Sequence, residues 1–185
     1  MIKRTLLLIA AFLVVSIPAM AQFEIGASYE LRDESPKNGF GVRVQTGILQ
    51  GLPLIKLGLR GHFSYFSEEN TISSTGGSYS KEIENYDFGL AAIGGISLGL
   101  MEPYVGVGLG SENVDLKHKD FQGVTVTPQD DEESSIYWNT FVGAKVSILP
   151  ILKPFVEYRF TGHTLEMPSM SDRTGRIIFG IALSF

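Results

Sequence analysis

The feature that most constrains this chain is a period of two in its hydropathy. Beyond the first two dozen residues, apolar or aromatic residues alternate with polar residues, charged residues or glycine in eight segments of strand length. In the first of these segments Phe23, Ile25 and Ala27 alternate with Glu24 and Gly26. Side chains of a β-strand point alternately to opposite faces, so the pattern predicts strands with one apolar face and one polar face. We therefore expect an all-β protein.

The other segments repeat this pattern to the end of the chain. Their apolar positions lie within residues 40–48, 55–65, 86–92, 105–109, 138–148, 156–160 and 177–185. We call the alternate positions on the polar face of each strand the polar parity. Five apolar residues stand at such positions: Phe66, Ile93, Phe141, Phe155 and Ile178. We expect these five either at the rims of the sheet or in its interior.

The first 21 residues have the layout of a cleaved export signal. The basic pair Lys3–Arg4 precedes ten apolar residues, Leu6–Val15, and the small-x-small triplet Ala19–Ala21 follows. Ten residues are too few to cross a bilayer as a helix, which takes roughly 20. We therefore expect residues 1–21 to be a signal peptide and residues 22–185 to form one barrel domain.

The composition excludes several kinds of chemistry. The chain has no cysteine, which rules out a disulfide scaffold, a thiolate zinc site and a cysteine nucleophile. Its formal charge of −5 argues against a nucleic-acid partner, because such binding depends on basic residues that neutralise phosphates. We expect no cofactor, no metal and no catalytic residue.

Alternation alone does not distinguish a soluble barrel, with its apolar face inside, from a membrane barrel, with its apolar face outside. The polar parity is rich in glycine, as expected for the crowded interior of a narrow barrel. The aromatic residues gather near strand ends, as in the girdles of membrane barrels. We expect Phe23 and Phe185 at one membrane interface. We expect six aromatic residues at the other: Tyr29, Phe40, Tyr65, Tyr86, Trp138 and Phe160.

The lengths of the connections also favour a membrane barrel. Short links at about Leu49–Pro53 and Leu149–Lys153 contrast with longer polar ones at roughly Ser67–Asn85, Ser111–Ser135 and Gly162–Arg173. Membrane barrels have short periplasmic turns and long outer loops, and they close because a bilayer cannot hydrogen-bond an open sheet edge. The sequence thus predicts an eight-stranded antiparallel up-and-down transmembrane β-barrel with both termini in the periplasm.

The C-terminal strand carries a resemblance to a known family. The alternating series ends in a terminal phenylalanine and resembles the assembly signal of Gram-negative outer-membrane barrels: Phe179, Ile181, Leu183 and Phe185. The segments PYVGVGLG (103–110) and KPFVEYRF (153–160) resemble parts of the small barrels related to outer-membrane proteins A and X. This resemblance implies a place in the outer membrane of a Gram-negative bacterium, with membrane lipid, lipopolysaccharide and the barrel-assembly machinery as partners.

Charged residues on the polar parity predict a polar network inside the barrel. Seven basic and five acidic residues fall there: Arg32, Arg43, Lys56, Arg60, Lys145, Arg159 and Arg176, with Glu24, Glu30, Asp87, Glu112 and Glu157. An unpaired buried charge is costly, so we expect ion pairs that fill the bore of an eight-stranded barrel. The alternative is a narrow pore for small solutes.

The outer connections are the candidates for a binding function. Asn70–Lys81 is centred on the hairpin signal Gly76–Gly77, and Phe121–Thr127 also alternates, so both stretches can form strands that project beyond the membrane. Such strands offer backbone groups to another chain, which predicts an extracellular protein or host-surface partner. We therefore expect a structural or surface-interaction role.

Two further motifs allow other functions. The run Asp130–Glu133 offers carboxylates to divalent cations, or is simply a solvated acidic loop. His163, with Thr164, Ser169 or Ser171, allows the alternative of an outer-membrane enzyme that modifies lipid A. The residue two positions after His163 is Leu165, so no His-x-Ser motif begins at His163, and we expect it to be a loop residue without a catalytic role.

Overall fold

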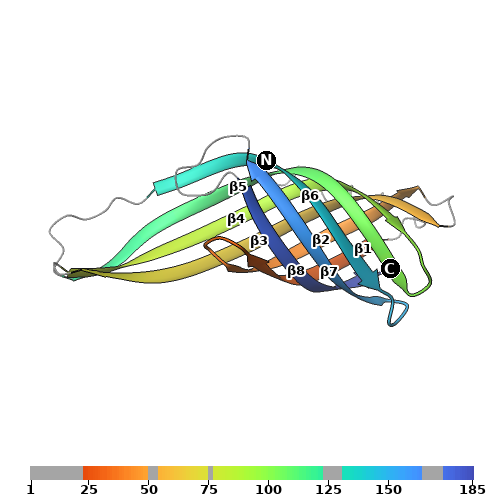
Figure 1. The fold of residues 1–185 in the computed structure, drawn as a ribbon, viewed down its shortest axis with the longest axis horizontal. Helices are drawn as coiled ribbons and strands as arrows, with labels where there is room; N and C mark the ends of the chain where they lie inside the picture. Colours follow the sequence, from red (N-terminus) through yellow and green to blue (C-terminus); the bar gives the residue numbers. More distant parts are fainter. Residues whose placement is uncertain (1–22, 50–53, 75–76, 123–130, 164–172) are drawn as a thin grey trace, which may run out of the picture.

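The computed structural model describes residues 23–49, 54–74, 77–122, 131–163 and 173–185. These residues form eight strands: β1 (Phe23–Arg32), β2 (Asn38–Leu49), β3 (Ile55–Ser74), β4 (Gly77–Ile96), β5 (Met101–Gln122), β6 (Asp131–Val146), β7 (Leu152–His163) and β8 (Arg173–Ser184). Each strand pairs with the next in an antiparallel ladder, and β1 pairs with β8 to close the barrel (Figure 1). The predicted fold class is confirmed.

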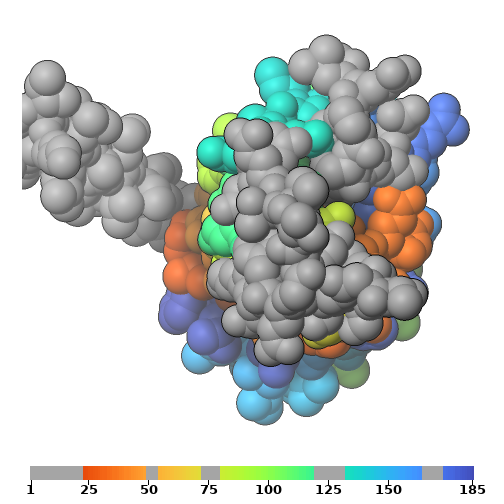
Figure 2. Space-filling view, turned by 90° about the vertical axis from the view of Figure 1, so that its left-hand side faces the viewer, coloured from red at the N-terminus to blue at the C-terminus, as the bar shows by residue number. Residues whose placement is uncertain are grey.

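The two ends of the barrel differ (Figure 1). The short connections β2–β3, β4–β5 and β6–β7 lie at one end, where Phe23 and Phe185 exchange backbone hydrogen bonds of 3.3 and 2.8 Å. At the other end β3, β4 and β5, which have 20, 20 and 22 residues, extend well past the shorter strands. Figure 2 shows this second end face on. We call these the short-turn end and the projecting end.

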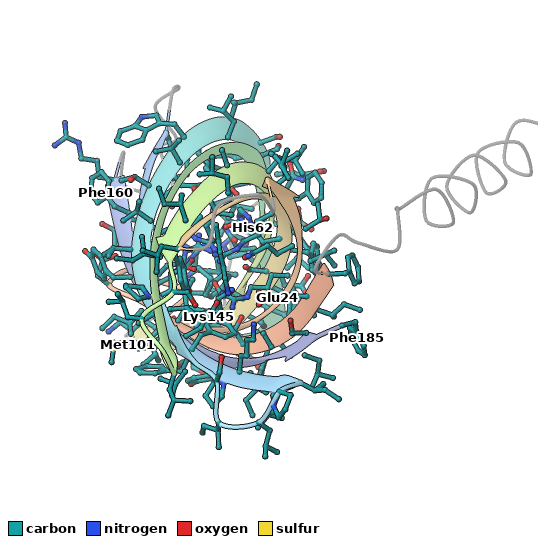
Figure 3. All side chains as sticks on the ribbon, turned by 90° about the vertical axis from the view of Figure 1, so that its right-hand side faces the viewer. Glu24, His62, Met101, Lys145, Phe160 and Phe185 are labelled. Atoms are coloured by element: carbon teal, nitrogen blue, oxygen red, sulfur yellow. The ribbon has the colours of Figure 1, made fainter. Side chains whose placement is uncertain are left out.

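Burial is inverted relative to a water-soluble barrel. The outward side chains of Leu90 and Leu109 are 62% and 66% exposed, whereas inward Asp87 and Glu112 are 1% exposed. Figure 3 shows Glu24, His62 and Lys145 inside the ring of strands, and Met101, Phe160 and Phe185 outside it. Exposed apolar surface is unfavourable in water, at about 25 cal/mol per Å², but is stable against lipid tails. The sequence alternation therefore places an apolar band on the outside of the barrel.

The apolar residues on the polar parity fill the interior. All five are buried: Phe66, Ile93, Phe141, Phe155 and Ile178. Phe141 lies directly across from Gly106, where a Cβ atom would come within 2.2 Å of the ring. Phe155 lies across from Gly180 in the same way, at 2.4 Å. An inward glycine thus makes room for each ring on the neighbouring strand.

The turn between β4 and β5 shows why one glycine is needed at the short-turn end. Leu98 and Met101 exchange backbone hydrogen bonds of 2.8 and 3.3 Å around a two-residue turn. Gly99, the first central residue of that turn, has φ of +67°. Glycine adopts this left-handed conformation without steric cost, and it is the preferred first residue of such hairpin turns.

The projecting hairpin expected at Asn70–Lys81 is present, and only the expected strand ends and the position of its turn are corrected. The β3–β4 ladder continues to the pair Ser74–Gly77, and β5 continues to Gln122. Gly77 therefore belongs to β4, and residues 75–76 join the two strands. The side chains of Ser67–Thr71 are exposed or half-buried at both parities, so the hydropathy difference that marks the membrane segments is absent there. Of the stretch Phe121–Thr127, residues 123–127 lie outside the described residues.

Among the described residues, no helix is long and apolar enough to cross a membrane.

Candidate functional site

The charged bore is the first candidate site. All twelve residues of the predicted interior network point into the barrel, and each forms an ion pair. Eleven are buried, while the side chain of Lys56, at the short-turn end, is 39% exposed. The pairs form three clusters along the barrel axis, which we call the outer, middle and inner clusters. The outer cluster lies nearest the projecting end.

The outer cluster joins opposite walls of the barrel. Asp87 on β4 and Glu112 on β5 are direct cross-strand neighbours, as are Arg32 on β1 and Arg176 on β8. Arg32 lies 2.6 Å from Glu112 and 3.8 Å from Asp87, and Arg176 lies 2.7 Å from Asp87. Two like charges side by side on one wall repel each other. The two carboxylates are therefore neutralised by the arginines on the opposite wall, and the two arginines by the carboxylates. These contacts therefore hold the two halves of the closed barrel together.

Polar side chains complete the outer cluster. Arg176 also binds Glu30 at 3.2 Å, and Ser64 donates a hydrogen bond to Glu30 at 3.1 Å. The Tyr137 hydroxyl donates to Asp87 and lies 3.0 Å from Nε2 of His62. Tyr137 and His62 were not predicted for the network, although each lies on the inward parity of its strand. The predicted network was limited to residues with a formal charge, so it left out the Tyr137 hydroxyl and the His62 imidazole.

The middle cluster is built on one carboxylate. Glu157 lies 2.5 Å from Arg60, 2.8 Å from Arg159 and 3.6 Å from Arg43, and it accepts a 3.0 Å hydrogen bond from the Tyr104 hydroxyl. Glu157 is 1% exposed. Three guanidinium groups thus share one buried anion, so this cluster carries excess positive charge.

The interior aromatic rings support the arginines. The guanidinium carbon of Arg43 lies 3.3 Å from the Phe155 ring centre, and that of Arg32 lies 3.8 Å from the Phe66 ring centre. A guanidinium over the face of a ring gains cation–π attraction and leaves its edges free for carboxylates. The rings that break the alternation therefore position the charges of the bore.

The inner cluster contains two charges that the sequence did not reveal. Glu102 lies 2.8 Å from Lys56 and 3.5 Å from Lys153, and Lys145 lies 2.7 Å from Glu24. Glu102 and Lys153 lie just outside the expected segments, but parity with Tyr104 and Phe155 would have predicted them. Four of these side chains border a cavity of about 40 Å³, which holds no more than a few water molecules: Glu24, Lys56, Glu102 and Lys145.

His163 is not a loop residue, which corrects the expectation. It is the last residue of β7, its side chain is 1% exposed, and its Nε2 lies 2.6 Å from Oε2 of Glu112. Its expected neighbours Thr164, Ser169 and Ser171 lie outside the described residues. The histidine therefore extends the outer cluster toward the projecting end.

The acidic run is also not the loop that was expected. Residues 131–133 begin β6, while Asp130 lies outside the described residues. No group of three or more metal-ligating side chains occurs in the described part of the chain.

The residues of the expected assembly signal lie on the outer surface of the closing strand. Phe179, Ile181, Leu183 and Phe185 are between 40% and 69% exposed and point away from the bore. Beside them, an aromatic row follows the register around one side of the barrel: Tyr29, Phe40, Tyr65 and Tyr86 are successive cross-strand partners on β1 to β4. Such a row is typical of the girdle at a membrane interface.

The projecting sheet is the second candidate site. The β2–β3 ladder ends at Gly39–Phe66, so among the described residues Ser67–Ser74 of β3 pair only with β4. The backbone of this stretch forms a sheet edge just beyond the aromatic row. An unpaired edge is a template for another strand.

Glu68 ties the base of this edge to the β1–β2 turn. Its carboxylate accepts hydrogen bonds from the Asn70 amide, from the Lys37 backbone N–H at 3.0 Å and from the Ser35 hydroxyl at 3.1 Å. These donors, with Asn70 making the largest contribution, lower the pKa of Glu68. On the outward face of the sheet, a hydrogen bond to Glu84 raises the pKa of Lys117.

The comparisons with known proteins agree on the fold. No protein-family model matches the chain, and no curated protein matches it. Three solved structures each cover 89% of the chain: a major outer membrane protein from Thermus thermophilus (16% identity, 99% of that chain, TM-score 0.66), neisserial surface protein A (16%, 97%, 0.58) and Ail, the attachment invasion locus protein of Yersinia pestis (13%, 97%, 0.55). The chain has the fold of the small eight-stranded outer-membrane barrels.

Proposed function

We propose that this chain is an outer-membrane protein that binds partners through the edge of its projecting sheet. The observation that carries the proposal is the edge of β3 at Ser67–Ser74, which among the described residues pairs with β4 alone. A partner chain that adds a strand there would gain main-chain hydrogen bonds. Because these bonds depend little on side chains, one edge can accept partners of varied sequence.

The other surfaces of the barrel are less suited to partner binding. The outward band of apolar side chains is in contact with lipid, and the bore is occupied by paired charges and aromatic rings. The projecting end is therefore the surface that an extracellular protein or a host surface can reach. Membrane lipid, lipopolysaccharide and the barrel-assembly machinery remain proposed partners of the outward band and of β8.

Two similar barrels have names that fit this proposal. One is called neisserial surface protein A, and the other is called an attachment invasion locus protein and was solved with a heparin analogue, sucrose octasulfate. Their likeness to this chain concerns the fold, and the feature of this chain that supports partner binding is the β3 edge.

A shortened hairpin tests the proposal. Replacing Glu69–Glu82 by a two-residue Asn-Gly turn keeps the pair Glu68–Ile83 and the Glu68 contacts to the β1–β2 turn but removes the outer edge. The matched control replaces only residues 75–76 by Asn-Gly. We expect both variants to assemble, and cells that carry the shortened barrel to lose adhesion to matrix-coated surfaces that the control retains. Equal adhesion of the wild-type, shortened and control proteins would contradict the proposal.

A further inference from the structure

A row of buried polar side chains lies on the wall formed by β6, β7 and β8. Asn139 is the cross-strand partner of Thr161, which is in turn the partner of Thr174. All three are exposed by 1% or less, and the Asn139 amide and both threonine hydroxyls form no hydrogen bond among the described residues. Buried polar groups in native proteins are almost always paired with protein, water or an ion. The row therefore indicates an occupant.

The next inward positions on β7 and β8 add two charged donors. Arg159 and Arg176 are cross-strand partners one inward position from Thr161 and Thr174. Arg159 donates Nε and Nη2 to Glu157, which leaves its buried Nη1 without a hydrogen bond among the described residues. Arg176 binds carboxylates through Nη1 and Nη2, and its buried Nε also has no hydrogen bond among the described residues. Direct cross-strand partners have Cβ atoms about 5 Å apart, so the four side chains form one compact block.

The charges around this block do not balance. The outer and middle clusters together contain five arginines and four carboxylates: Arg32, Arg43, Arg60, Arg159 and Arg176, with Glu30, Asp87, Glu112 and Glu157. The arginines and carboxylates alone, five against four, give these two clusters a net charge of one positive charge. A buried charge without a counter-ion is unfavourable, and water satisfies donors without neutralising them. One monovalent anion satisfies both requirements.

We propose that Thr161, Thr174, Arg159 and Arg176, with the Asn139 amide, bind one small monovalent anion of the halide class inside the barrel. The two hydroxyls, the amide N–H group and the two guanidinium N–H groups are the donors. Each of these residues is exposed by 3% or less, so the ion would be enclosed within the barrel. The site is separate from the projecting sheet, so its test does not depend on partner binding.

Halide-dependent stability tests the site in solution. The folded barrel in detergent micelles is unfolded in urea at constant ionic strength, with sodium bromide replaced stepwise by sodium gluconate, whose anion is too large for the site. An ion that binds only the folded state raises the folding equilibrium constant by the factor 1 + [L]/Kd, which is about elevenfold at ten times Kd. We expect the wild type to show this saturable bromide effect.

Isosteric variants show whether the effect comes from the proposed site. Thr161→Val and Thr174→Val, singly and together, remove hydroxyl donors while keeping the side-chain volume, and Thr140→Val on the outward face of β6 is the matched control. We expect the control to keep the bromide effect and the Thr161 and Thr174 variants to lose most of it. Anomalous diffraction from crystals grown in bromide should show a peak among Thr161, Thr174, Arg159 and Arg176. The proposal would be overturned if the wild type showed no bromide effect or if the single variants kept the full effect. It would also be overturned if the crystals showed ordered water at the site without an anomalous peak.

Discussion

Replacing Glu157 by glutamine should strongly destabilise the barrel. The carboxylate is 1% exposed and lies 2.5, 2.8 and 3.6 Å from Arg60, Arg159 and Arg43. Glutamine keeps the shape of the side chain but leaves three buried guanidinium groups without their anion. Removing one partner of a buried ion pair typically costs about 3–5 kcal/mol. We therefore expect Glu157→Gln to lower the folding equilibrium constant by about two orders of magnitude or more.

Urea unfolding in detergent micelles, followed by the heat-dependent gel shift of folded barrels, measures this loss. Glu69→Gln removes the same charge from an exposed position on the projecting sheet and should change stability by no more than about 0.5 kcal/mol. The double variant Glu157→Gln/Arg60→Gln should lose less stability than the sum of the single changes, because the two groups form one pair. A loss below about 1 kcal/mol in Glu157→Gln, or strict additivity in the double variant, would refute the argument that paired charges stabilise the bore.

Three other predictions concern assembly, conduction and pH. Deleting Phe185, whose backbone pairs with Phe23, should reduce insertion in outer-membrane fractions but not export; equal insertion would contradict a role in assembly. Planar-bilayer recordings should show no steady conductance, and ion-selective channels that change in Arg43→Gln would indicate an open pore. The pKa of Glu68 is lowered in the folded state, so its stabilising contacts are complete above its usual pKa and are lost as the pH falls through the folded value. Hydrogen exchange of the Lys37 amide, corrected for intrinsic rates, should lose protection over that acidic range in the wild type, and a Glu68→Gln variant with the same pH profile would contradict this role.

The sequence predicts the barrel because the bilayer imposes one environment along each membrane-spanning segment. Alternation therefore identified the outward residues and the inward charges together, and parity alone placed residues such as Arg60 and Glu157 inside. The projecting hairpin of β3 and β4 was predicted from the turn signal at Gly76–Gly77 and the residues on its two arms, but the sequence did not give the exact ends of these strands.

The contacts within the bore are harder to predict from the sequence. Parity shows that Asp87 and Arg176 both point inward, but it does not show that they meet across the lumen, because that contact depends on the shear of the closed barrel. The stacking of Arg43 on Phe155 likewise depends on Gly180, which makes room for the Phe155 ring. The strand register is needed to see that Phe155 and Gly180 are cross-strand partners. Glu102 and Lys153 were missed because the expected strands were drawn too short.

Fluorescence of the single tryptophan tests most directly the claim that the apolar face of this barrel meets lipid. Trp138 is the only tryptophan in the chain, points outward from β6 and is 45% exposed, with its ring 5.8 Å from that of Phe160. The wild-type protein, reconstituted in vesicles whose acyl chains carry bromine at defined depths, should be quenched most by bromines near the headgroups and only weakly by aqueous iodide. Strong iodide quenching with no effect of brominated lipid at any depth would contradict the account.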